Sequence, residues 1–93
     1  MRLKDYEQAA ILTTVRLFDE GAVVYLFGSR ADDTKKGGDI DLLIFSGRID
    51  RDAARAIKSR LYDLLGEQKI DLVVTTDPAD PFVCVALETG VRL

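Results

Sequence analysis

Two short apolar segments of this 93-residue chain follow one pattern and stand on either side of a single amphipathic segment. Residues 40–45 (IDLLIF) and 70–75 (IDLVVT) are rich in aliphatic and β-branched side chains, which is typical of buried β-strands. Residues 51–65 between them place apolar side chains on one helical stripe, and Gly66 is a typical helix stop. Two strands joined by one helix pair in parallel through a right-handed crossover. The sequence therefore predicts a strand–helix–strand unit at the centre of the fold.

The remaining segments predict a small sheet around this unit. The apolar spacing and the turn signals indicate a helix over 5–20, a strand over 22–27 and a short helix over 81–88. The first strand reaches the second through a short connection, which favours an antiparallel pair. We therefore expect an α/β (α+β) fold in one domain, residues 1–93, with helices packed on a small mixed β-sheet.

Composition narrows the class of protein. The chain is 47% hydrophobic and 31% charged, which is typical of a folded globular domain. No apolar run approaches the roughly 20 residues that span a membrane, and the first ten residues lack the apolar core of a secretory signal. The single cysteine, Cys84, fits a reducing compartment, so we expect a cytoplasmic protein without membrane contact. The net charge of −3, without a basic stripe, argues against a domain that holds a long nucleic acid alone.

Three acidic residues stand at the starts of the two related strands. Asp39 and Asp41 flank Ile40, and residues two apart in a strand project from the same face of the sheet. Asp71 has the same place in the later strand, and parallel pairing brings both strand starts to one edge. Like charges this close repel one another, and burial adds to the cost unless the acids bind a cation. The alternative is that each acid is a solvated residue at a strand end.

The absence of histidine favours Mg²⁺ as that cation. Histidine is the commonest transition-metal ligand, and this chain has none. Carboxylate oxygens are ligands that a hard cation such as Mg²⁺ prefers. Three acids can hold two Mg²⁺ ions, an arrangement that clamps the attacking and leaving oxygens of a phosphoryl or nucleotidyl displacement.

A Gly-Ser pair supplies the second half of the pattern. The first predicted strand breaks at Gly28, where a glycine lets the backbone approach a ligand closely. Ser29 is expected to cap a short helical turn, whose N–H groups suit a phosphate. The cations that could neutralise more phosphate charge are Arg30, Lys35 and Lys36. The alternatives are an ion pair of Arg30 with a neighbouring acid, Asp32 or Asp33, and solvated lysines.

The order of these motifs resembles a known family. A Gly-Ser pair, nine residues, Asp-Ile-Asp-Leu and a later Ile-Asp-Leu are similar to the DNA polymerase β-type nucleotidyltransferase superfamily, and the short length resembles its minimal nucleotidyltransferase (MNT) branch. The resemblance covers residues 23–93 and implies a polymerase β palm-like fold. Members of this branch are often encoded beside a helical HEPN protein. Several such pairs act as toxin and antitoxin, and the nucleotidyltransferase can silence the toxin by transferring AMP from ATP to a tyrosine.

The resemblance also implies roles for single residues. Gly28 and Ser29 match the phosphate-binding pair, and Asp39 and Asp41 match the Mg²⁺ ligands. Asp71 matches the third acid, which helps to bind metal and to activate the acceptor hydroxyl. Many relatives have serine directly before the first acid, whereas this chain has Gly38.

Two functions of different classes follow from these patterns. The first is an enzyme that transfers AMP from ATP to a tyrosine of a HEPN toxin and thereby acts as an antitoxin. The second is a non-catalytic antitoxin that neutralises the toxin by occupying its surface. A small-molecule nucleotidyltransferase is a third reading, but its acceptor pocket usually needs a second domain, which only an oligomer could supply here.

The remaining apolar and aromatic residues are expected to pack in the core. This expectation covers residues 83–87 (VCVAL), including Cys84, and the three tyrosines, Tyr6, Tyr25 and Tyr62. As an alternative, the outer face of residues 82–87 forms a partner surface, and an exposed tyrosine accepts a self-modification.

Overall fold

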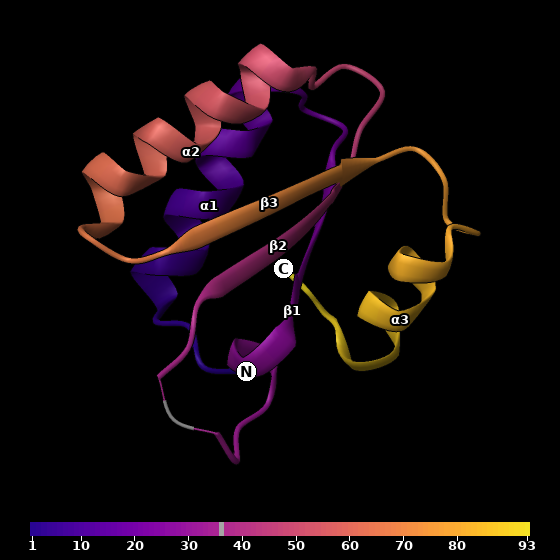
Figure 1. The fold of residues 1–93 in the computed structure, drawn as a ribbon. Helices are drawn as coiled ribbons and strands as arrows, with labels where there is room; N and C mark the ends of the chain where they lie inside the picture. Colours follow the sequence, from indigo (N-terminus) through magenta and orange to yellow (C-terminus); the bar gives the residue numbers. More distant parts are fainter. Residues whose placement is uncertain (36) are drawn as a thin grey trace.

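The computed structural model describes residues 1–35 and 37–93 and shows one four-stranded sheet with helices on both faces (Figure 1). Its elements are α1 (Asp5–Phe18), β1 (Val23–Phe27), the 3₁₀ helix η1 (Gly28–Ala31), β2 (Ile40–Phe45), α2 (Arg51–Leu65), β3 (Ile70–Thr75), α3 (Pro81–Thr89) and β4 (Val91–Arg92). The strand order is β3-β2-β1-β4, so β3 forms one edge of the sheet.

The pairing within the sheet confirms the expected mixed topology. β2 and β3 are parallel, with Ile40 opposite Ile70, and α2 connects them. β1 runs antiparallel to β2 and places Phe27 opposite Asp41. The short strand β4 is antiparallel to β1. The starts of β2 and β3 therefore lie side by side with the end of β1, and this corner of the sheet carries the predicted site.

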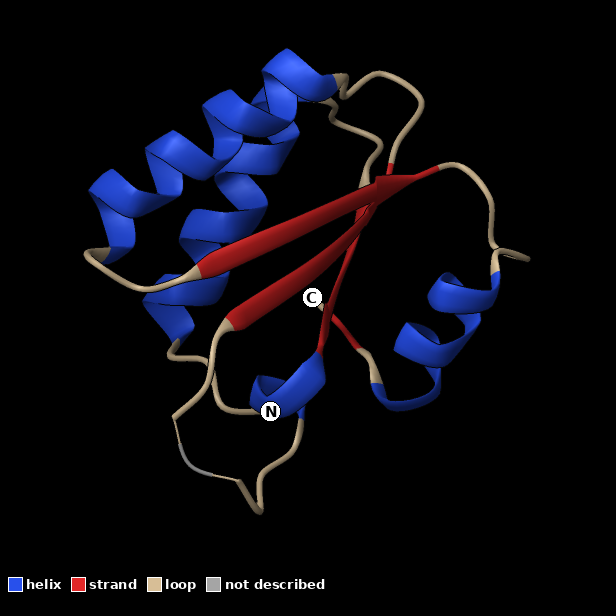
Figure 2. Ribbon diagram, viewed as in Figure 1, coloured by secondary structure: helices blue, strands red, loops and turns tan. Residues whose placement is uncertain are grey.

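The two faces of the sheet are covered unequally. α1 and α2 cover one face, and α3 alone lies on the other (Figure 2). Leu42 and Ile44 face α1 and α2 in the larger core, whereas the alternate residue Leu43 packs with Val83 and Ala86 of α3. A nine-residue helix covers only part of a sheet face, and the aromatic side chains on that side stay half-buried.

Several predicted boundaries needed correction. α1 ends at Phe18 and not at residue 20, because Asp19 has extended backbone and caps the helix through its N–H. α3 extends to Thr89 and not only to residue 88, and Val91–Arg92, for which the sequence indicates no element, form β4. A two-residue strand is stabilised by its partner β1 and not by its own sequence, so local pattern gave no signal for it.

The expected core packing of α3 and of two tyrosines was wrong in part. Val83 and Ala86 are buried, but Cys84 is exposed and Val85 is 63% exposed, because a single face of α3 contacts the sheet. Tyr25 is half-buried beside Phe45. Tyr6 and Tyr62 are exposed and lie near lysine ammonium groups, Lys4 and Lys58 respectively.

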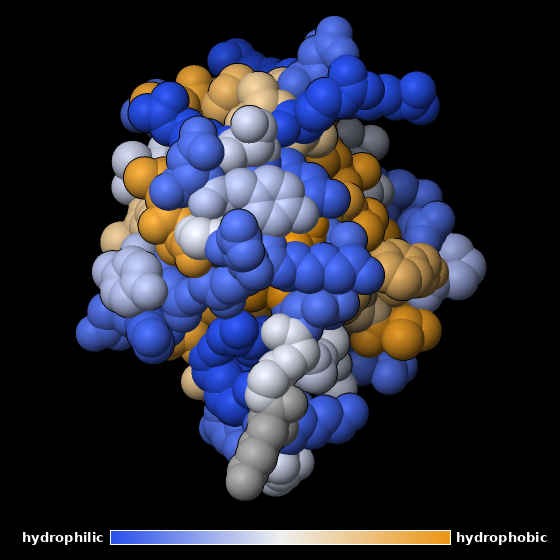
Figure 3. Space-filling model, turned by 60° about the vertical axis from the view of Figure 1, so that its left-hand side comes forward, coloured by the Kyte–Doolittle hydropathy of each residue, from blue (hydrophilic) through white to orange (hydrophobic). Residues whose placement is uncertain are grey.

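Apolar side chains also reach the surface on the side of the two long helices. Figure 3 shows apolar areas within an otherwise hydrophilic surface on this side of the molecule. Leu17 of α1 is 62% exposed and Leu64 of α2 is 52% exposed, and both line a shallow groove between the helices. Within residues 1–35 and 37–93, no helix combines the length and apolar character required to cross a bilayer.

Candidate functional site

The fold brings the three predicted acids to one corner of the sheet. Asp41 is the second residue of β2 and Asp71 the second residue of β3, and the two are register partners in adjacent parallel strands. Asp41 shares a sheet face with Leu43, two residues along the strand, so it projects on the side of α3. Asp39 lies directly before β2, and a carboxylate oxygen of Asp39 is 3.6 Å from Nζ of Lys69.

Burial and the neighbouring acids disfavour the charged form of Asp41. Burial raises the pKa of the Asp41 carboxyl, and the nearby charges of Asp71 and Asp39 raise this pKa further. A hydrogen bond with Asp71 acts in the same direction, whereas Lys69 lowers the pKa. The corner therefore carries negative charge that the protein's own cations compensate only in part, which is the electrostatic condition for binding a cation.

The three acids offer the type of ligand that a hard divalent cation prefers. All three side chains have carboxylate oxygens, and Asp41 and Asp71 lie side by side on the same face of the strand pair. Among the described residues, however, no three acidic, histidine or cysteine side chains are spaced to hold one ion. Asp39 is engaged with Lys69 instead. A bound cation would therefore compete with the Lys69 ammonium for this carboxylate.

Gly28 packs its backbone against one of the acids. Its φ is +71°, which L residues with side chains rarely adopt. A β-carbon at this position would lie 2.4 Å from Oδ2 of Asp41, which is closer than any real contact allows. The backbone at Gly28 thus lies close to the Asp41 side chain, whereas its expected approach to a ligand stays a prediction.

Ser29 and Gly38 form a second close contact. A β-carbon on Gly38, whose φ is +94°, would lie 2.1 Å from Oγ of Ser29. The Ser29 hydroxyl therefore fills the space where a serine side chain at position 38 would begin. Ser29 does not cap a helix as expected, because it lies inside η1 and Phe27 holds the N-cap position.

Arg30 binds protein groups on three sides. Its Nε donates to the Gly38 carbonyl at 3.1 Å, its Nη1 to the Arg2 carbonyl at 3.0 Å and its Nη2 to Oε1 of Gln68 at 3.0 Å. The alternative ion pair was wrong, because the Asp33 carboxylate pairs with the N-terminal amine and Asp32 accepts hydrogen bonds from Thr34.

The structure describes one of the two lysines of this segment. Lys35 is exposed and lines a hollow beside η1, together with Gly28, Ser29 and Thr89. This hollow has a volume of about 520 Å³, which leaves room for a small ligand next to the Gly-Ser pair. Lys36 lies outside the residues that the structure describes.

Sequence reasoning missed two polar residues that belong to this corner, Glu7 and Gln68. Glu7 is only 3% exposed, and its carboxylate accepts hydrogen bonds from the Lys4 N–H and from Nε2 of Gln68. Burial raises the pKa of Glu7, but these hydrogen bonds and the charges of Arg30 and Lys4 outweigh it, so the pKa is lowered. A sequence signal existed, because Glu7 stands four residues before Ile11 on the buried stripe of α1.

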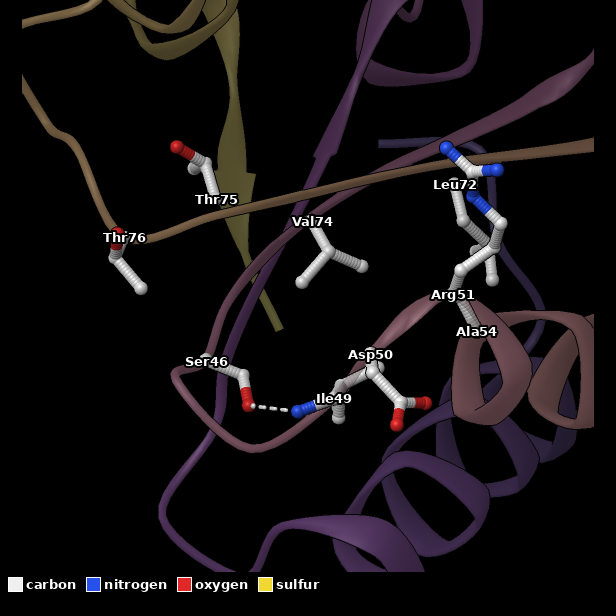
Figure 4. A pocket seen from close by; sticks show the side chains of 9 residues that line it. All are labelled: Ser46, Ile49, Asp50, Arg51, Ala54, Leu72, Val74, Thr75 and Thr76. Atoms are coloured by element: carbon white, nitrogen blue, oxygen red, sulfur yellow. Dashed lines mark hydrogen bonds between the residues drawn. The ribbon is translucent and has the colours of Figure 1, made fainter.

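A larger hollow of about 560 Å³ lies between β3 and the start of α2, and its lining includes Leu72 and Val74, which pack on the sheet face opposite to the acids (Figure 4). Ser46, which follows β2, and Thr75, which ends β3, line it, and Oγ of Ser46 accepts a hydrogen bond from the Ile49 N–H at 3.1 Å. The acids stand at the opposite ends of the same strands. Because this hollow gathers no cluster of acids, its size does not make it the functional site.

The fold agrees with comparisons to known proteins. The family described as "Polymerase beta, Nucleotidyltransferase" matches residues 9–93. The fold is similar to that of a mutant MntA–HpeT toxin–antitoxin structure, with a TM-score of 0.72 and 22% identity over 92% of this chain and 70% of that chain. It is also similar to a structure of a tri-AMPylated HEPN toxin from Shewanella oneidensis in complex with an MNT antitoxin, with a TM-score of 0.60 and the same identity and coverage. No curated protein sequence gives a match.

Proposed function

Because this chain belongs to the polymerase β-type nucleotidyltransferase family, we propose that it is a Mg²⁺-dependent enzyme that transfers AMP from ATP to a tyrosine of a HEPN-type toxin, and so acts as an antitoxin. The observation that carries this proposal is the register of Asp41 opposite Asp71, with Asp39 two residues earlier and the Gly28 backbone packed against Asp41.

The proposed roles follow from the chemistry of each side chain. Asp39, Asp41 and Asp71 would hold Mg²⁺, which would supply positive charge to neutralise the triphosphate. The N–H groups and the hydroxyl at Gly28 and Ser29 bind phosphate oxygens. Asp71 takes the proton of the acceptor hydroxyl as its oxygen forms a bond to the α-phosphorus. The bond from that phosphorus to the bridging oxygen breaks, and pyrophosphate leaves with the electron pair.

The partner in this proposal is supported by the structural neighbours. One of them is a complex of an MNT antitoxin with a HEPN toxin that carries AMP groups, and the other is a toxin–antitoxin pair. In this proposal, the tyrosine of the toxin reaches the acids on the side of α3, where this short helix covers only part of the sheet face.

A non-catalytic antitoxin is the second candidate, and one observation favours it. Val85 of α3 is 63% exposed, and Phe82, whose ring packs against that of Phe27, is still 51% exposed. Apolar side chains of this size on a helix face are typical of the buried centre of a protein interface. Such a face could hold a toxin without any chemistry at the acids.

Co-expression with the cognate toxin separates the two functions. The parent protein is compared with the double variant Asp39→Asn, Asp41→Asn, and the intact mass of the toxin is measured. For an enzyme, the toxin gains one or more AMP units with the parent only, and toxicity returns with the double variant. An unmodified toxin together with equal protection by both proteins would show a binding module. Asp63→Asn, an exposed acid of α2, is the matched control.

A further inference from the structure

A hydrogen-bonded chain runs from a buried carboxylate to the guanidinium of Arg30. Oε2 of Glu7 accepts from Nε2 of Gln68 at 2.9 Å, and Oε1 of Gln68 accepts from Nη2 of Arg30 at 3.0 Å. Nε2 of Gln68 also donates to the Leu65 carbonyl at 3.0 Å. The Gln68 amide thus presents its oxygen to the cation and its nitrogen to the anion, which fixes its orientation. Arg30 is thereby held in one direction and is not a freely moving surface cation.

The chain of contacts ties together the segments that carry the candidate site. Arg30 belongs to η1 with Ser29, and its Nε holds the carbonyl of Gly38, the residue before Asp39. Gln68 lies in the connection that leads into β3 and Asp71. One guanidinium therefore joins the Gly-Ser turn, the entry to β2 and the entry to β3.

The backbone of Arg2 provides a second tie to the same turn. Its N–H donates to the Arg30 carbonyl at 2.8 Å, and its carbonyl accepts from Nη1 of Arg30 at 3.0 Å. The Arg2 side chain donates to the Ser29 carbonyl at 2.7 Å and to the Asp32 carbonyl at 3.0 Å. These hydrogen bonds hold the turn by its carbonyl oxygens, and none of them involves the Ser29 hydroxyl.

We propose that Arg30, oriented by Gln68 and Glu7, is a positioning residue that holds the Gly38–Asp39 peptide against the Ser29 turn. Asp39 and the phosphate-binding turn are thereby arranged in advance for the magnesium complex of a nucleoside triphosphate. The inference rests on the proposed function for the identity of that ligand. In this role Arg30 acts by holding the Gly38 carbonyl, whereas its position in the sequence suggests a direct contact with phosphate. Three of its donors are already engaged with protein acceptors.

Amide hydrogen exchange of the ligand-free protein tests this positioning. The variants are Arg30→Gln, Gln68→Leu and their combination, with Arg55→Gln on the exposed side of α2 as the control. We expect amides of residues 37–41 to exchange about tenfold faster in both single variants, as a local hydrogen-bonded unit opens more often. The double variant should exchange no faster than Arg30→Gln, because both changes break one chain of contacts. Parental exchange in Gln68→Leu would overturn the proposal.

A reversed pair tests the contact between positions 7 and 68 while keeping one donor and one acceptor there, although the donation from Gln68 to the Leu65 carbonyl is lost. Gln68→Glu alone sets two carboxylates against each other, whereas Glu7→Gln with Gln68→Glu restores one donor and one acceptor and leaves a carboxylate facing Arg30. Exchange of residues 37–41 should therefore be fast in Gln68→Glu and return toward the parental rate in the pair. If amide exchange instead becomes faster throughout the core strands, and the pair does not restore it, these residues serve only the stability of the fold. That outcome would contradict the proposal.

Binding of the magnesium complex of ATP distinguishes positioning from direct contact. Positioning predicts that Arg30→Gln and Gln68→Leu both raise the dissociation constant, by about tenfold, as measured by calorimetry. A direct phosphate contact predicts a large increase for Arg30→Gln and none for Gln68→Leu, and that outcome would overturn the inference. A parent protein that binds the complex but transfers no AMP would refute the proposed function alone, since the exchange and binding results do not depend on transfer.

Discussion

A β-carbon on Gly28 would lie 2.4 Å from Oδ2 of Asp41, so the backbone of the Gly-Ser turn and the carboxylate of the strand fill adjoining space with nothing between them. The turn and the acid are therefore one unit. A side chain at position 28 must displace the carboxylate, the backbone or both.

Gly28→Ala should abolish nucleotide transfer and lower the melting temperature. Two effects combine, since alanine at φ +71° costs about 1 kcal/mol and its methyl group also displaces Asp41. Gly37→Ala separates them, because φ at Gly37 is +62° but a β-carbon there meets nothing within 4 Å. That control should lose stability and keep transfer, as measured by thermal melting and release of pyrophosphate. Equal activity loss in both variants would show that backbone strain, and not contact with Asp41, is responsible.

Asp41→Asn should melt no lower than the parent in the absence of metal, and it should not transfer AMP. Burial and the charges of Asp71 and Asp39 raise the pKa of Asp41, which means that its charged form is disfavoured in the folded protein. The amide removes this repulsion. Thermal melting in EDTA measures the effect, and Asp63→Asn is the control. A clear loss of stability would contradict the description of this corner as a site of uncompensated charge.

Magnesium and ATP together should raise the melting temperature of the parent protein. A ligand that binds only the folded state stabilises it by about 2.7 kcal/mol at one hundred times its dissociation constant. The shift should largely disappear with EDTA and in the Asp39→Asn, Asp41→Asn variant. If ATP stabilises the protein equally with and without metal, its binding does not involve the three acids.

Stability should fall with decreasing pH through the titration of Glu7. Burial raises its pKa, but hydrogen bonds from Gln68 and Lys4 outweigh this and lower it, so the folded state binds the proton more weakly than the unfolded state. The stabilising contribution is therefore complete above the unfolded pKa of about 4.3 and is lost as pH falls through the folded value. Glu7→Gln should melt lower than the parent at pH 7, and this difference should shrink toward pH 3. A constant difference would refute the linkage.

Val85→Glu should weaken toxin binding without changing transfer to a small hydroxyl acceptor. The residue is 63% exposed on α3, and a charge there opposes burial in an interface. Leu17→Glu is the matched control, because Leu17 is 62% exposed on α1, which covers the opposite face of the sheet. Pull-down of the toxin measures the effect. If Leu17→Glu abolishes binding and Val85→Glu does not, the interface lies over α1.

The strand–helix–strand unit could be predicted to the residue. β2, α2 and β3 begin and end where the sequence indicates, because strong apolar patterns are bounded by clear signals. Asp50 accepts from the Ala53 N–H at the start of α2, and Gly66 takes a positive φ after its end. The meeting of Asp41 and Asp71 then follows from the topology alone.

The rest of the corner depended on contacts between distant parts of the chain. Arg30 and Gln68 are 38 residues apart, and neither carries a local signal for its partner. Glu7 could have been singled out as a charged residue on a buried stripe, but its connection to the site runs through Gln68. The exposure of Cys84 likewise depends on how α3 rotates against the sheet, which an apolar segment does not specify.

The position of β3 at the edge of the sheet affects the behaviour of the purified protein. One side of its backbone pairs with β2, and the other has no neighbouring strand in the described sheet. The strand is apolar apart from Asp71 and the closing Thr75, so it resembles the edges that join sheets of separate molecules into aggregates. Asp71 is then the only charge on this strand that opposes such pairing. Replacing it to inactivate the enzyme removes that protection as well, so inactive variants at this position should be handled in dilute solution.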